Sequence, residues 1–270
     1  MVEIIAESIL KCTVPVSSGG STPGVGAGWA VSRSRVLIPG YTGPLDSVVS
    51  GAVDILYDQS GQGRNLTATS APARPVATTS GPNSRECCDF SPASPSIGHV
   101  LDTDAGDPIS DLITASSGYV VVSIRPDAVS QDVGVAFGYL NANVLNFGGF
   151  AGAGGVLAIR AGGIFYAFNH DGARDCAASA SGAVPIGGNP CVIEWRHEGG
   201  NIYQRVNGGG ETSVASGNTA DLSNVLKMGY GNQTGTFFNG KIFEAMIYAA
   251  VPTQAERDAI VHDMMLWVGA

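Results

Sequence analysis

The sequence has few basic residues and no long apolar run, and each shortage excludes a class of partner. It carries 14 lysines and arginines against 23 aspartates and glutamates, which gives a net charge of −9. We therefore expect no nucleic-acid partner, because binding to phosphates requires clustered positive charge. No apolar run approaches the roughly 20 residues of a membrane-spanning helix, so we expect no membrane partner.

The N-terminus lacks the basic segment of a secretory signal peptide. Glu3 and Glu7 stand where such a peptide would carry positive charge. We therefore expect the chain to be made and kept in a cytoplasm.

The five cysteines do not form a metal-binding pattern. No Cys/His cluster has zinc-like spacing, and we expect no metal and no cofactor. Cys176 and Cys191 could close a short loop, whereas the neighbours Cys87 and Cys88 should face opposite sides of a strand. Cys12 could form an intermolecular disulfide after oxidation, or could be an idle thiol. The sequence leaves the pairing open.

Glycine and short apolar segments are abundant. The 38 glycines are about twice the usual share of roughly 7%, and hydrophobic residues make up 44% of the chain. Short strand candidates recur between Gly, Pro, Asn and Asp clusters, and residues 192–198 and 202–207 flank Gly199 and Gly200 as a hairpin. This pattern predicts an all-β sandwich or jelly roll over residues 25–270.

Two segments depart from the strand pattern. Thr253 and Glu256 form a capping box, and apolar residues then recur at helical spacing, which predicts a helix over 253–268. Residues 1–24 read as an arm that ends in a flexible hinge. The arm could pair with a partner's sheet edge or fold back on its own domain.

The most specific local pattern is a polar corner within residues 55–66. Its structural turn comprises Asp58, Gln59, Ser60, Gly61 and Gly63. Asp58 and Ser60 can hydrogen-bond nearby backbone amides, and the glycines permit backbone angles that other residues disfavour. We expect a fixed structural corner here.

This corner, together with segments 41–44, 117–122 and 235–240, resembles concanavalin A-like (laminin G-like) jelly-roll domains. Such domains occur in phage virion structural proteins and as the catalytic domain of fungal α-L-arabinofuranosidase B. The resemblance covers most of residues 41–270. It implies a concanavalin A-like two-sheet jelly-roll sandwich with a short C-terminal helix.

The same resemblance implies where catalytic carboxylates should stand. A retaining glycosidase needs two carboxyl groups about 5–5.5 Å apart. The stretch that matches the family's nucleophilic glutamate carries Asn169, and the region of its acidic aspartate carries Asn232. Unless Asp171 or Glu244 has been recruited, we expect no catalytic residue and no enzyme activity.

Other acidic residues offer weaker candidates. Glu194 and Glu244 lie in expected strands and could face a cleft, but we expect them to point into solvent. Residues 102–107 have the composition of a calcium loop, yet the glycine is misplaced, so we expect a polar turn.

The leading hypothesis is a non-catalytic virion structural protein of a tailed phage, such as a capsid decoration, neck or collar, or fibre-base protein. Residues 1–24 would anchor it to other virion proteins, and we expect a homo-oligomer located in the virion. A carbohydrate-binding module that recognises host-surface glycans is the alternative, with Tyr139, Phe147, Phe150 and Tyr166 as candidate sugar-binding residues unless they fill the core. An arabinofuranosidase-like glycoside hydrolase is the third hypothesis.

Overall fold

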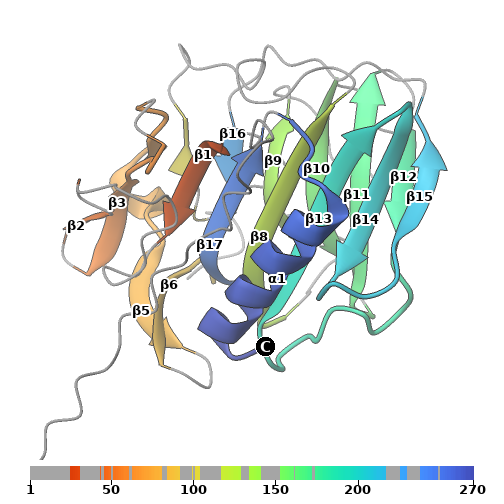
Figure 1. Cartoon of the computed structure of the whole chain (residues 1–270). Helices are drawn as coiled ribbons and strands as arrows, with labels where there is room; N and C mark the ends of the chain where they lie inside the picture. Colours follow the sequence, from red (N-terminus) through yellow and green to blue (C-terminus); the bar gives the residue numbers. More distant parts are fainter. Residues whose placement is uncertain are drawn as a thin grey trace, which may run out of the picture.

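The strands of the chain form two stacked antiparallel sheets, with one described α-helix against the first of them (Figure 1). We call them sheet 1 and sheet 2. The computed structural model describes residues 25–30, 43, 46–49, 51–60, 63–80, 84–91, 99, 101–103, 117–128, 134–140, 153–160, 162–171, 174–216, 226–229, 238–248 and 250–270.

Sheet 1 has the strand order β15–β14–β13–β8–β17, and β1 and β6 share the outer edge of β17. Its strands are β15 (Thr212–Ala215), β14 (Asn201–Val206), β13 (Cys191–Glu198), β8 (Gly118–Pro126), β17 (Gly240–Tyr248), β1 (Val25–Ala30) and β6 (Arg85–Asp89).

Sheet 2 has the order β4–β7–β16–β9–β10–β11–β12. Its strands are β4 (Leu66–Ala68), β7 (Leu101–Asp102), β16 (Leu226–Met228), β9 (Gly134–Leu140), β10 (Ala153–Arg160), β11 (Ile164–Asp171) and β12 (Arg174–Ala178).

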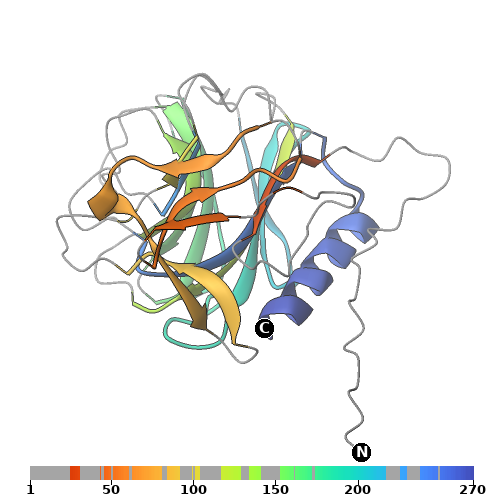
Figure 2. The same ribbon diagram turned by 90° about the vertical axis from the view of Figure 1, so that its left-hand side faces the viewer.

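A smaller group of strands joins the two sheets at one edge. Strand β3 (Ala52–Leu56) pairs with β4 of sheet 2 and with β2 (Asp46–Val49), and it touches β5 (Val76–Ser80), which pairs with β6 of sheet 1. A 3₁₀ turn, η1 (Ala71–Ala73), lies between β4 and β5. Figure 2 shows this group in front of the edges of the sandwich.

The main core lies between the sheets, and its residues follow the alternation of the strands. In β13, Ile193 and Trp195 belong to this core, whereas Val192 belongs to a second cluster on the other side of sheet 1. Successive strand side chains point to opposite faces, so both faces of sheet 1 are buried. This explains the almost continuous burial along β8 and β17.

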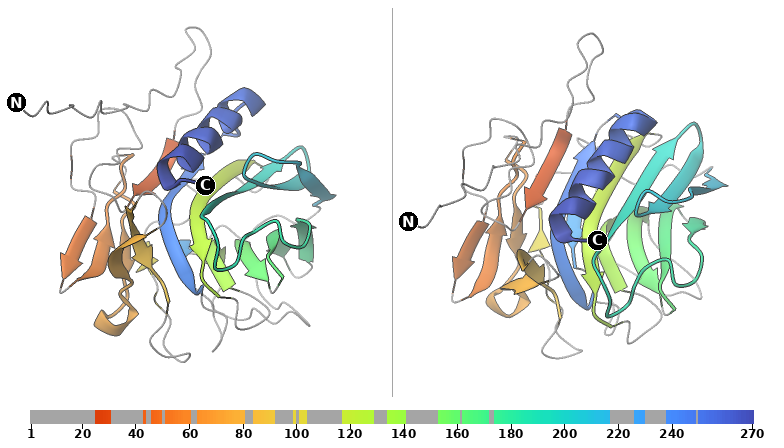
Figure 3. Two further views of the ribbon diagram at one scale, coloured as in Figure 1. Left: turned by 90° about the horizontal axis from the view of Figure 1, so that it is seen from below. Right: turned by 60° about the horizontal axis from the view of Figure 1, so that its bottom comes forward.

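The second cluster is covered by helix α1 (Gln254–Val268). The helix begins at the predicted capping box of Thr253 and Glu256, and it ends at Gly269 in the left-handed conformation with φ 73°. Figure 3 shows that α1 lies across the outer face of β17, β8 and β13. Its buried residues Ile260, Val261 and Met264 pack in this cluster. No helix in the described part of the chain is long and apolar enough to cross a membrane.

The polar corner after β3 is held by Asp58, which is 3% exposed. Its carboxylate accepts a hydrogen bond from the backbone N–H of Ser60 at 2.9 Å, and its own N–H donates to Asn65 Oδ1 at 3.0 Å. Gln59 is also buried, and Gly63 has φ 77°. The fifth residue of the predicted turn, Gly61, lies outside the described residues.

The fold class predicted from the sequence is confirmed: the chain is an all-β jelly roll with one C-terminal helix among its described elements. The strand candidate at 29–37 began too late, because β1 starts at Val25 and ends at Ala30. The candidate at 144–147 and the arm at 1–24 lie outside the described residues.

The four described cysteines are free thiols. The suggested bridge between Cys176 and Cys191 is therefore not formed, and the two residues belong to strands of different sheets. Cys88 lies in the main core, whereas Cys87 packs with Phe243 on the other side of β6. The two neighbours face opposite sides as expected, although both are buried. Cys12 lies outside the described residues.

Candidate functional site

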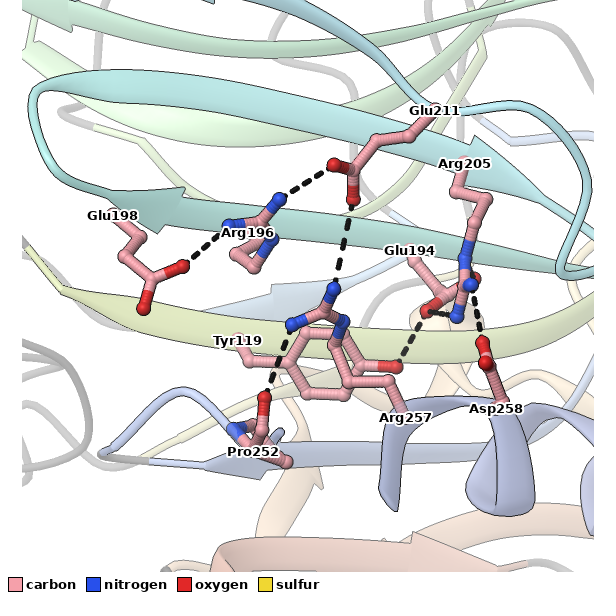
Figure 4. Close-up of polar contacts among 9 residues, drawn as sticks. All are labelled: Tyr119, Glu194, Arg196, Glu198, Arg205, Glu211, Pro252, Arg257 and Asp258. Atoms are coloured by element: carbon pink, nitrogen blue, oxygen red, sulfur yellow. Dashed lines mark hydrogen bonds and ion pairs between the residues drawn. The ribbon is translucent and has the colours of Figure 1, made fainter. Parts of the chain in front are cut away.

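The most extensive polar network lies between sheet 1 and helix α1, around Glu194 (Figure 4). Tyr119 Oη donates to Glu194 Oε1 at 2.7 Å, and Arg205 donates from Nε to Oε2 at 2.5 Å and from Nη2 to Oε1 at 2.7 Å. Arg205 Nη1 continues to Asp258 on the helix. Burial and the charge of Glu194 raise the pKa of Tyr119 well above its usual range.

A second arginine continues the network along the same face of sheet 1. Arg196 donates to Glu198 and Glu211, and its guanidinium lies 3.5 Å from the ring centroid of Tyr203. Glu211 also faces Arg257 of α1, whose Nη1 donates to the carbonyl of Pro252 at 3.0 Å. The helix is thus fastened to the sheet by two arginine–carboxylate groups.

The network is organised for stability rather than for acid–base chemistry. Both oxygens of Glu194 accept hydrogen bonds, and the residue is only 3% exposed beneath the helix. Glu244 is 1% exposed and lies in β17 opposite Ser123. The expectation that these two glutamates point into solvent is therefore wrong, because α1 and its flanking strands cover this face.

A sequence signal for the Glu194 pair exists in the hairpin itself. A two-residue turn pairs residues that lie equally far from it, so a turn at Gly199 and Gly200 places Arg205 opposite Glu194. The sequence analysis identified the hairpin but did not derive this pairing. What it could not supply is Tyr119, which lies 75 residues earlier.

A third charged cluster lies at one end of the sandwich. Lys241 contacts both Asp127 and Asp89, the latter at 3.2 Å, and Arg125 Nε lies 3.2 Å from Asp127 Oδ1. Burial alone would raise the pKa of Asp89, but hydrogen bonds from Ser91 and the charge of Lys241 lower it. These opposite charges offset one another, so the cluster does not resemble a catalytic pair of carboxylates.

The remaining ion pair lies on the outer face of sheet 2, turned away from α1. Leu101, Leu226 and Met228 enter the main core, so the alternating residues Asp102 and Lys227 face the other way. Lys227 Nζ lies 2.5 Å from Asp102 Oδ2, and the two side chains are 15–16% exposed. Asp102 thus belongs to a strand rather than to the predicted polar turn; residues 104–107 lie outside the described residues.

The surroundings of this pair differ from those of Glu194. Asp102 Oδ1 is buried and has no hydrogen-bond partner. Burial raises the pKa of Asp102 despite the nearby Lys227. Cross-strand pairing continues from Lys227 to Gly138 of β9, and from Asp102 to the exposed Thr67 of β4. A glycine and a small polar residue therefore flank the pair.

The predicted sugar-binding aromatics are only partly described. Tyr139 lies in β9 and Tyr166 in β11, both in sheet 2, but their side chains are outside the described part of the structure. Phe147 and Phe150 are outside it altogether. Asn169 and Asp171 lie in β11 of sheet 2, whereas Glu244 is in sheet 1. Asp171 and Glu244 thus come from different sheets. No group of three possible metal ligands occurs among the described residues.

Comparison with known proteins supports the fold. No protein-family model and no curated protein matches the sequence. A GH54 α-L-arabinofuranosidase soaked with a cyclic sulfate inhibitor matches with a TM-score of 0.61 and 12% identity. An arabinofuranosidase complexed with arabinofuranosyl-α-1,2-xylobiose matches with a TM-score of 0.62 and 12% identity. Both matches cover 90% of this chain and 63% of the other, so the chain spans less than two thirds of these enzymes.

This finding corrects the expectation that the chain is not an enzyme. That expectation rested on the missing carboxylates at Asn169 and Asn232. The fold that the chain shares over 90% of its length is nevertheless the fold of arabinofuranosidases. Replacement at those two positions is therefore not sufficient to exclude catalysis.

Proposed function

We propose that this chain is a carbohydrate-active jelly-roll domain that binds glycans on the outer face of sheet 2. The observation that carries the proposal is the partly exposed Asp102–Lys227 pair on this face, next to Gly138. Fixed charged groups supply the orientation and specificity of small-molecule sites. A glycine position beside them leaves room for a sugar ring to approach the sheet.

The contrast with sheet 1 supports this choice of face. The outer face of sheet 1 is occupied by α1 and by the Glu194 network, so its charged groups already have protein partners. The solved arabinofuranosidases of similar fold add support for a carbohydrate ligand.

The test is glycan binding by the whole chain, followed by localisation of the site. A glycan array identifies the ligand, and calorimetric titration measures its affinity. We expect Thr67→Trp, beside Asp102, to weaken binding at least tenfold by blocking the face sterically. The matched control is Ser213→Trp, an exposed position on the outer face of sheet 1. Absence of binding to any glycan, or an equal loss in both variants, would refute the proposal.

Glycoside hydrolysis is the second candidate, favoured by the likeness to arabinofuranosidases. Two recruited carboxylates would have to be tested separately, because Asp171 and Glu244 belong to different sheets. The assay is release of nitrophenol from nitrophenyl furanosides and pyranosides. Turnover that is lost in Asp171→Asn but kept in Glu244→Gln would support hydrolysis on sheet 2. No turnover of any of these substrates would count against this candidate.

A further inference from the structure

The Asp102–Lys227 pair has an asymmetry that defines the ligand chemistry it can take. Lys227 Nζ fixes Asp102 Oδ2 at 2.5 Å, while the other oxygen, Oδ1, accepts no hydrogen bond within the described structure. An unpaired buried acceptor is costly, and for charged groups the cost is larger than for neutral ones. A donor supplied by a ligand would remove this cost.

We propose that Asp102 is the specificity-determining residue of the glycan site, and that its Oδ1 accepts a hydrogen bond from a hydroxyl group of a neutral sugar. This inference rests on the proposed function and goes beyond it by naming the contacting atom and the ligand class. An ionised carboxylate only accepts hydrogen bonds. Hydroxyl groups can donate to it, whereas the carboxylate or sulfate of an acidic glycan cannot.

The role of Lys227 in this arrangement is to position the carboxylate. Asp102 and Lys227 are directly opposed on β7 and β16, so the ion pair is set by the register of the sheet. Side chains directly opposite one another on adjacent strands interact closely. With Oδ2 held by the ammonium group, Oδ1 has a fixed position, and the ligand need not order the carboxylate on binding.

The experiment compares neutral and acidic oligosaccharides on the whole chain and on two variants. We expect wild type to bind neutral oligosaccharides and to reject sialylated, uronate-bearing and sulfated ones. Asp102→Asn should weaken neutral binding about tenfold to a hundredfold, because a hydrogen bond to a charged group is lost. Lys227→Met should weaken it less, because the accepting oxygen remains. The matched control is Asp54→Asn, which removes the Arg74–Asp54 ion pair elsewhere on the surface.

The outcomes separate this inference from the proposed function. Neutral binding that is unchanged in Asp102→Asn, or binding of acidic glycans only, overturns the inference and leaves the proposed function standing. Absence of glycan binding by wild type overturns both. Thermal unfolding verifies that each variant is folded, and if Asp102→Asn does not fold, the neutral-to-acidic selectivity of wild type and Lys227→Met decides the question.

Discussion

Glu194 in sheet 1 and Asp102 in sheet 2 are both carboxylates paired with a basic residue directly opposite on the adjacent strand. Glu194 receives hydrogen bonds on both oxygens and lies beneath α1, with Asp258 of the helix sharing the same arginine. Asp102 has one oxygen held by Lys227 and the other without a partner, on the face turned away from the helix. The comparison separates a carboxylate that holds the fold together from one that is placed to meet a ligand.

The largest effect should come from breaking the Glu194 network. Arg205→Met leaves Glu194 buried with Tyr119 as its only printed neighbour in the network, and removal of one partner from a buried ion pair costs about 3–5 kcal/mol. We expect a loss of this size in the free energy of unfolding, measured by urea denaturation. Arg74→Met removes an ion pair whose side chains are 24–27% exposed, and it should cost about 1 kcal/mol or less. Similar losses in the two variants would contradict the structural role of the network.

Cysteine chemistry sharpens the comparison of the two sheets. Cys191 in β13 is fully buried, and burial raises its pKa to about 12. At pH 8 only about 10⁻⁴ of such a thiol is the reactive thiolate. Cys176, in the edge strand β12, is partly exposed. We expect iodoacetamide to modify Cys176 at least a hundredfold faster than Cys191 in the native protein, measured by peptide mass spectrometry. Equal rates after unfolding in urea provide the control, and equal rates in the native state would be inconsistent with this packing.

The parts of the fold that the sequence predicted are those whose signal is local. Long strands such as β8 and β17 alternate or are continuously apolar, and α1 begins with a capping box. Strands β4 and β15 were missed because they have only three and four residues. Such segments become strands through their partners, and their own residues carry little periodicity.

The candidate site was less predictable for the same reason. Asp102 lies in an aspartate-rich run that is typical of a turn, and it becomes part of a sheet by pairing with Lys227, 125 residues later. Glu194 is buried because Tyr119 and Asp258 reach it from β8 and α1. Sequence spacing shows neither contact. The predicted turn at Asp58, by contrast, uses partners within seven residues.

A smaller effect should appear in the dependence of stability on pH, with opposite signs for Asp89 and Asp102. The pKa of Asp89 is lowered from its ordinary 3.8, so its contribution is present above pH 3.8 and is lost as the pH falls through the folded-state pKa. The pKa of Asp102 is raised from 3.8, so stability falls as the pH rises from 3.8 through the folded-state pKa. Urea midpoints of Asp89→Asn and Asp102→Asn between pH 3 and 7 should therefore diverge from wild type in opposite directions. Divergence of the same sign would show that one environment is misassigned.

The smallest effect on stability should follow deletion of residues 1–24, which removes no described strand, since β1 begins at Val25. Both sheets and α1 keep their described partners, so we expect the thermal midpoint to change little relative to the full chain. The virion role, with this segment as the anchor to capsid or tail proteins, stays a prediction from the sequence resemblance. If it holds, the shortened chain folds and keeps its glycan binding but does not enter particles in a complementation assay. Normal incorporation would refute the anchoring role, and a large drop in the thermal midpoint would show that the segment packs against the jelly roll.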